Sequence, residues 1–189
     1  MLSMNQTKSI TKANLSVKVQ VVATIAAIVS AVALPQIVHL IGRATGMGTG
    51  FGELLLPMHL PVLLVGLLAG PFAGTVAGML GPICSFGLSG MPSAVVLPFM
   101  MVELAVYGLC AGLLRKSTLP TMLKVFIAQV AGRVSRAAAV AVAFYVLGTT
   151  EIPVVSVWNG TVNGLTGIAI QLLLLPLIVV TVEKMSAHE

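Results

Sequence analysis

The sequence predicts an all-α integral membrane protein: a bundle of six transmembrane helices with both termini in the cytoplasm. Composition is the first reason, because 58% of the 189 residues are hydrophobic and only 8% are charged, whereas an ordinary soluble domain carries about 25% charged residues. Length is the second reason, since spans of about 20 apolar residues leave room for six crossings and no separate soluble domain. We therefore expect a single integral membrane domain over residues 1–189, surrounded by lipid.

Clusters of glycine, proline and charged residues divide the chain into six apolar segments. Backbone groups in hydrocarbon have to be hydrogen-bonded within their own segment, so each apolar segment is predicted to be a helix. The first one follows Lys8, Lys12 and Lys18 and is too long for a signal peptide, so we expect it to be retained. The predicted spans are residues 17–41, 54–69, 72–88, 94–114, 121–147 and 158–182.

The distribution of basic residues predicts the orientation. With six spans, Arg43 is the one basic residue outside the spans that falls on the side opposite the termini. Cytoplasmic flanks are enriched in Lys and Arg, so both termini are expected in the cytoplasm of a multi-pass plasma-membrane protein. This rule accounts for the net charge of +5, and no nucleic acid partner is expected.

Enzyme and metal signatures are missing from the sequence. Cys84 and Cys110 both lie inside apolar segments and are interpreted as packing residues rather than as metal ligands or a disulfide framework. There is no HExxH, no GxSxG, no Walker lysine and no acidic pair at catalytic spacing. We therefore expect neither an enzyme nor a bound cofactor or metal.

Charged side chains in two predicted spans are the strongest functional signal. Gln129, Arg133 and Arg136 share one helix face at i, i+4 and i+7, and Glu103 is central in the fourth span. Such groups are costly in the membrane and either line a cavity or pair with each other. If Glu103 pairs with one arginine, the other remains, and a guanidinium in a dry pocket binds carboxylate or phosphate in a bidentate manner. The pattern predicts a small anionic ligand.

Other polar residues have two interpretations each. Asn159 and Asn163 share a face of the sixth span, and Trp158 is the first residue of that span. The two asparagines either bind hydroxyl or amide groups of a ligand or form interhelical hydrogen bonds, with Trp158 lying at the membrane interface in the second case. His59, near the outer end of the second span, is either a ligand contact or a structural donor. The glycine-rich segment 46–52 is expected to be an outer loop that is suited to a lid.

Two ladders of small residues predict close helix contacts. Each ladder packs either within this bundle or against another membrane subunit. The ladders are Ala23, Ala27 and Ala31 in the first span, and Gly66, Gly70, Gly74 and Gly78 across the second and third spans.

Residues 58–71, followed by Gly74, Gly78 and Gly90-Met91-Pro92, resemble the substrate-binding S components of energy-coupling factor (ECF) vitamin transporters. The resemblance implies a prokaryotic membrane subunit that captures a vitamin from outside and has no ATPase of its own. It also implies docking through the first helix, at the alanine ladder, onto a transmembrane coupling subunit driven by two cytoplasmic ATPases. Ligand sites in this family draw on the outer loops and the last three helices, which here carry Arg133, Arg136, Asn159 and Asn163.

Residues 58–92 look most like the group that includes pantothenate carriers. Pantothenate has a carboxylate, an amide and two hydroxyls, which would suit an arginine and two asparagines. Folate, biotin, lipoate, cobalamin and a pyridoxine-type ligand are alternatives within the same class. Two other classes stay open: a membrane scaffold subunit in which Glu103, Arg133 and Arg136 only hold the bundle together, and an unrecognised intramembrane enzyme.

Overall fold

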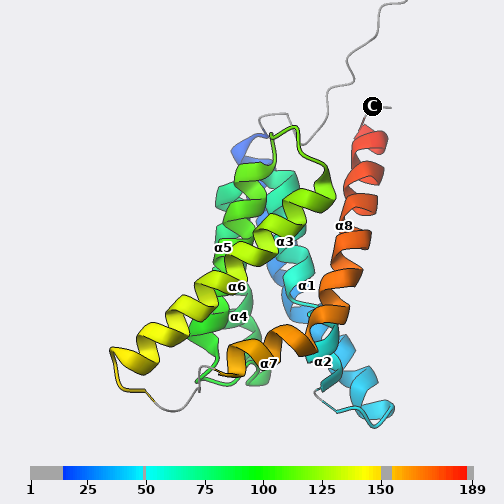
Figure 1. Ribbon diagram of the computed structural model, residues 1–189. Helices are drawn as coiled ribbons and strands as arrows, with labels where there is room; N and C mark the ends of the chain where they lie inside the picture. Colours follow the sequence, from blue (N-terminus) through cyan, green and yellow to red (C-terminus); the bar gives the residue numbers. More distant parts are fainter. Residues whose placement is uncertain (1–14, 49, 150–154, 187–189) are drawn as a thin grey trace, which may run out of the picture.

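The computed structural model describes residues 15–48, 50–149 and 155–186, which form eight α-helices and no strand (Figure 1). Six segments of these helices are long and apolar enough to cross a membrane, with α2 and α3 together forming one of them. This confirms the predicted all-α membrane fold. The helices are α1 (Val17–Ala44), α2 (Gly50–Leu55), α3 (His59–Ala69), α4 (Pro71–Ser89), α5 (Leu97–Leu114), α6 (Thr121–Tyr145), α7 (Val155–Asn163) and α8 (Leu165–Ser186).

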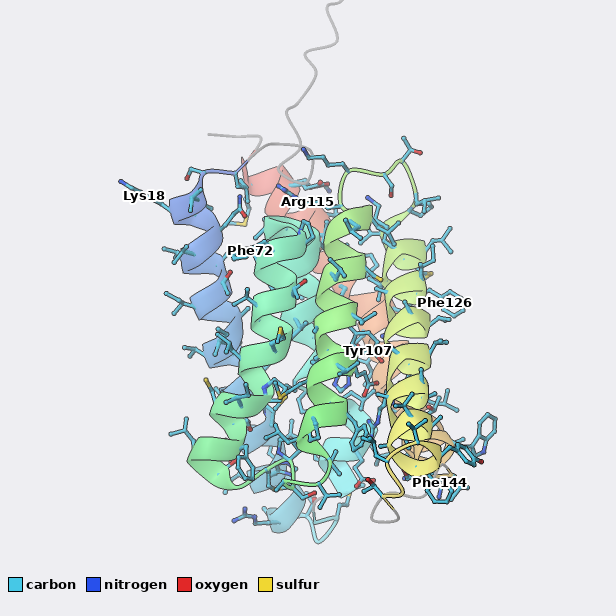
Figure 2. All side chains as sticks on the ribbon, turned by 90° about the vertical axis from the view of Figure 1, so that its left-hand side faces the viewer. Lys18, Phe72, Tyr107, Arg115, Phe126 and Phe144 are labelled. Atoms are coloured by element: carbon cyan, nitrogen blue, oxygen red, sulfur yellow. The ribbon has the colours of Figure 1, made fainter. Side chains whose placement is uncertain are left out.

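The start of α1 and the end of α8 lie at the same end of the bundle (Figure 1). Lys18 and Arg115 are at this end in Figure 2. The basic flanks are therefore gathered at the end where the described chain begins and finishes.

The structure breaks two of the predicted spans. Residues 54–69 are divided between α2 and α3, because Leu56 has a φ of 49° and Pro57 follows it. Residues 158–182 are divided at Gly164, where α7 crosses the end of the bundle and α8 runs along its length (Figure 1). Gly164 lies close to the segment after α2, because a Cβ there would lie 2.8 Å from Leu56 Cδ1.

Helix α3 is the centre of the core. Val62, Leu63 and Leu67 are almost completely buried and pack with Leu104 of α5 and Leu175 of α8 in one apolar cluster. Because α3 contacts α1, α4, α5 and α8, it joins the two sides of the bundle.

The glycine ladder packs inside the bundle. A Cβ at Gly74 would meet the backbone of Gly108, and one at Gly78 would meet the backbone of Leu104. Gly66 faces the same helix, where a Cβ would lie 2.6 Å from the Gly108 carbonyl oxygen. Small residues thus let α3 and α4 touch α5 backbone to backbone, which is the packing alternative considered for this ladder.

The alanine ladder also packs within the chain in this structure, which is the first of the two alternatives considered for it. Ala27 and Ala31 are 6% and 0% exposed, and Ala23 is partly buried. Ala27 packs with Ala69, Ala73 and Ala77 of α3 and α4, among other residues. Another subunit cannot touch Ala27 or Ala31 unless α1 moves away from these helices.

Candidate functional site

A buried ion cluster joins α5 to α6. The Glu103 carboxylate of α5 is 0% exposed and receives two guanidinium groups from α6. Arg136 Nη1 donates to Glu103 Oε2 at 2.9 Å, and Arg133 Nη1 lies 3.3 Å from Glu103 Oε1. The two arginines are three residues apart, so they project from one face of α6 towards the same carboxylate.

Tyr107 and His59 complete the surroundings of this carboxylate. The Tyr107 hydroxyl, one turn along α5, donates to Glu103 Oε1 at 3.0 Å. The His59 ring of α3 lies against the Tyr107 ring with centroids 5.3 Å apart. Gly132 of α6 leaves room for the tyrosine, because a Cβ there would overlap the Tyr107 ring. The cluster therefore depends on close approach of α5 and α6 at Gly132.

The cluster has more hydrogen-bond donors than Glu103 can use. Within the described residues, Arg133 Nε and Nη2 and Arg136 Nε are buried without a hydrogen-bond partner. Neither ring nitrogen of His59 has one either, and its Nε2 lies 3.9 Å from Glu103 Oε1. Two guanidinium groups face one carboxylate, so the buried charge is also unbalanced by one positive unit. Unsatisfied buried donors are costly, and a ligand that supplies acceptor oxygens and a negative charge would remove this cost.

Arg133, Arg136 and His59 line a pocket of about 520 Å³. The pocket lies at the end of the bundle where α2 and α7 are found, opposite Lys18 and Arg115. A volume between about 300 and 1,000 Å³ is typical of small-molecule sites. Its walls come from the second half of α1, the α2–α3 junction, the segment before α5, the second half of α6, and α7. Apolar lining residues include Leu56, Pro57, Met58, Met91 and Met100. The pocket is therefore mostly apolar with a cationic wall on α6.

The family comparison agrees with a substrate-binding membrane subunit. The profile described as "ECF transporter, substrate-specific component" matches residues 15–179. The chain belongs to this family. It is thus a transport subunit of the S component type and not an enzyme, and its six apolar helices make it a multi-pass membrane protein. Neither the curated proteins nor the solved structures include a significant match.

The pocket of this S component brings together most, but not all, of the side chains that the sequence singled out. Arg133, Arg136, Asn159, Asn163 and His59 line it. Asn163 is exposed, and its Nδ2 lies 3.4 Å from Glu53 Oε2 of α2.

Three other predicted site residues lie elsewhere. Glu103 sits behind the arginines rather than on the pocket wall. Trp158 is 69% exposed and does not line the pocket. Gln129, one turn before Arg133 on α6, is buried in a different polar contact.

Six polar lining residues of this S component were missed by sequence reasoning: Gln36 and His39 of α1, Glu53 of α2, Ser85 of α4, Ser93 before α5 and Ser156 of α7. Gln36 and His39 had a detectable signal, because they are two polar residues three positions apart in the largely apolar second half of the span. Glu53 and Ser156 had none, since both belong to short stretches between the long apolar segments.

Gln129 belongs to a buried amide chain that holds α8 in place. Its Nε2 donates to Gln171 Oε1 of α8 at 2.9 Å, and Gln171 Nε2 donates to the Leu56 carbonyl at 3.1 Å. Gln171 is 1% exposed, so water does not replace these bonds. The chain links α6, α8 and the α2–α3 junction beside the pocket.

We expect Gln171→Leu to lower the free energy of unfolding by about 1–3 kcal/mol, because the Gln129 amide and the Leu56 carbonyl lose their buried partner. The measurement is SDS-induced unfolding in mixed micelles. The Gln129→Leu/Gln171→Leu double variant should lose less than the sum of the two single changes. Additive losses would show that the two amides do not interact.

Proposed function

We propose that this S component binds a carboxylate-bearing vitamin, pantothenate, in the pocket between α1, α6 and α7. The observation that carries the proposal is the set of unpartnered guanidinium donors of Arg133 and Arg136 at the pocket wall. Because each arginine uses only Nη1 towards Glu103, further N–H groups stay available to a second anion. A carboxylate accepts such donors in paired, charge-assisted hydrogen bonds.

The rest of the lining supports a ligand of this size and mixed polarity. Asn159 and Asn163 of α7 offer amide groups for the ligand amide. Met58, Met91 and Met100 offer flexible apolar surface for the two methyl groups of pantothenate. His59 of α3 also lines the pocket and supplies a further donor or acceptor.

We further propose that the pocket opens to the outside of a prokaryotic plasma membrane and that both termini are cytoplasmic. Lys18 and Arg115 mark the end opposite the pocket, as the enrichment of basic residues in cytoplasmic flanks requires. On this arrangement the subunit delivers its ligand through a transmembrane coupling subunit that is powered by two cytoplasmic ATPases.

The deciding experiment is calorimetric titration of the purified protein with a panel of vitamins: pantothenate, folate, biotin, lipoate, cobalamin and pyridoxine. We expect pantothenate to bind most tightly. Arg136→Ala should weaken its binding about 100-fold, because a buried charge-assisted contact is lost. Arg133 still faces Glu103 in this variant, so the fold should survive. Arg43→Ala, an exposed arginine at the end of α1, is the matched control and should bind normally.

Other outcomes separate the alternatives. Tight binding of a different vitamin would keep the binding role and replace the ligand. If the folded protein binds no vitamin, and if Arg136→Ala merely lowers its stability, the scaffold interpretation replaces this proposal. Equal loss of binding in Arg43→Ala and Arg136→Ala would remove the pocket arginines from the mechanism.

A further inference from the structure

Helix α1 brings two polar side chains into the pocket. Gln36 and His39 are three residues apart, so they share one face of α1, and both line the pocket beside Pro35. The remainder of the second half of α1 is largely apolar. A polar pair on the pocket side of such a helix is a functional signal, because polar groups in a membrane span are otherwise selected against.

Both side chains hold polar atoms that the protein itself leaves unsatisfied. Gln36 Nε2 and His39 Nδ1 are buried, and neither has a hydrogen-bond partner in the part of the chain that the structure describes. The His39 ring is held against α2, where Gly52 makes room for it: a Cβ at Gly52 would lie 2.6 Å from His39 Cε1. The imidazole is therefore positioned by packing and is left with a free ring nitrogen.

This polar pair and the arginines approach the pocket from different sides. Helix α1 packs against α3 and α4, whereas α6 packs against α5 and α8. Figure 2 shows α1 and α6 at opposite sides of the bundle, with α4 and α5 between them. The pocket accordingly has a cationic wall on α6 and a second polar wall on α1.

We propose that Gln36 and His39 form a second subsite, which binds a hydroxyl group of the ligand at the side away from its carboxylate. The inference rests on the proposed function and adds to it the chemistry of the far end of the ligand. A hydroxyl fits both partners, since its oxygen accepts from the Gln36 amide while its hydrogen is donated to His39 Nδ1. Helix α1 is then a specificity-determining element of the site as well as a packing helix.

The subsite predicts discrimination against ligands without that hydroxyl. An analogue that lacks it leaves both side chains buried and unpaired, and sites built to hydrogen-bond a substrate hydroxyl reject such analogues. The wild type should bind pantothenate about 10-fold or more tightly than the analogue in which both hydroxyls are replaced by hydrogen.

The test is a titration of wild type and variants with these two compounds. Gln36→Met keeps the length of the side chain but removes its hydrogen-bond donor. The control is Gln20→Met, the same substitution on α1 outside the pocket, where Gln20 Nε2 donates to the Leu15 carbonyl. His39→Phe is the second variant and keeps a ring against Gly52. We expect Gln36→Met and His39→Phe to bind pantothenate about as weakly as the analogue, while Gln20→Met behaves as wild type.

Each result decides between the two proposals. If Gln36→Met and His39→Phe keep the wild-type preference for pantothenate, the subsite is wrong and the carboxylate site on α6 stands. If the wild type binds pantothenate and the analogue equally, the subsite is likewise wrong. If folded wild type binds neither compound, the proposed ligand itself fails and this subsite fails with it. Should one variant not fold, the preference of the other decides.

Discussion

Replacing Glu103 by alanine is expected to lower the free energy of unfolding by about 3–5 kcal/mol. Glu103 is fully buried and is the carboxylate that both Arg133 and Arg136 face. Without it, two guanidinium groups remain in the bundle with no opposite charge beside them. SDS-induced unfolding in mixed micelles measures the loss.

Two variants test the physical origin of this loss. Glu53→Ala removes an exposed glutamate at the pocket and should change stability by less than about 0.5 kcal/mol. The triple variant Glu103→Leu/Arg133→Leu/Arg136→Met removes the cluster as a whole, and buried ion pairs replaced by apolar groups of similar volume are often neutral or stabilising. We expect it to fold and to bind no carboxylate. A stable Glu103→Ala protein would show that the cluster does not hold α5 to α6.

The shared carboxylate explains how one cluster can serve both fold and binding. From the sequence, pairing of Glu103 with one arginine was one alternative, which would leave the other arginine over; the structure has both arginines on the same carboxylate. The cluster therefore carries one excess positive charge and several unpaired guanidinium N–H groups, rather than one arginine that is free of Glu103. Losing one arginine leaves Glu103 neutralised, whereas losing Glu103 leaves two cations unpaired.

Hydropathy predicts where the spans lie but not where they break. Long apolar runs require helices in hydrocarbon whatever their neighbours are. The break at Leu56 coincides with its φ of 49° before Pro57, and the break at Gly164 lies where this glycine packs against the Leu56 side chain, a contact between distant segments. Helix periodicity carries no information about such a contact.

The same limit explains which site residues the sequence could predict. Arg133 and Arg136 share a helix face by spacing alone, and their cost in the membrane requires a partner or a cavity. Trp158 and Asn159 are neighbours on α7, yet Asn159 lines the pocket and Trp158 is 69% exposed. Which of them faces inward depends on how α7 lies across the bundle end, and this is set by tertiary packing.

The alanine ladder shows a related ambiguity. Small residues at every fourth position indicate close packing without saying which helix is the neighbour. In this conformation Ala27 and Ala31 pack inside the chain, so we expect Ala27→Leu to disturb the contact of α1 with α3 and α4. A selective effect on docking to another subunit would require this contact to open.

Gly108→Leu is expected to cost about 3 kcal/mol of unfolding free energy or more, because it forces α4 and α5 apart. A Cβ at Gly108 would overlap the Gly74 backbone, which cannot rotate away as a flexible side chain would. Gly108 lies one residue beyond Tyr107 and five beyond Glu103 on α5. The displacement should therefore weaken ligand binding as well as stability.

Gly87→Leu is the matched control for this prediction. Gly87 is an exposed glycine of α4 with no atom within 4 Å of a Cβ placed on it, so leucine there adds helix propensity without a clash. We expect Gly87→Leu to be at least as stable as wild type in the same mixed-micelle assay, and to bind ligand normally. If both leucine variants are equally stable, the bundle tolerates separation of α4 from α5, and the close glycine contact is not what positions Glu103 towards the arginines of α6.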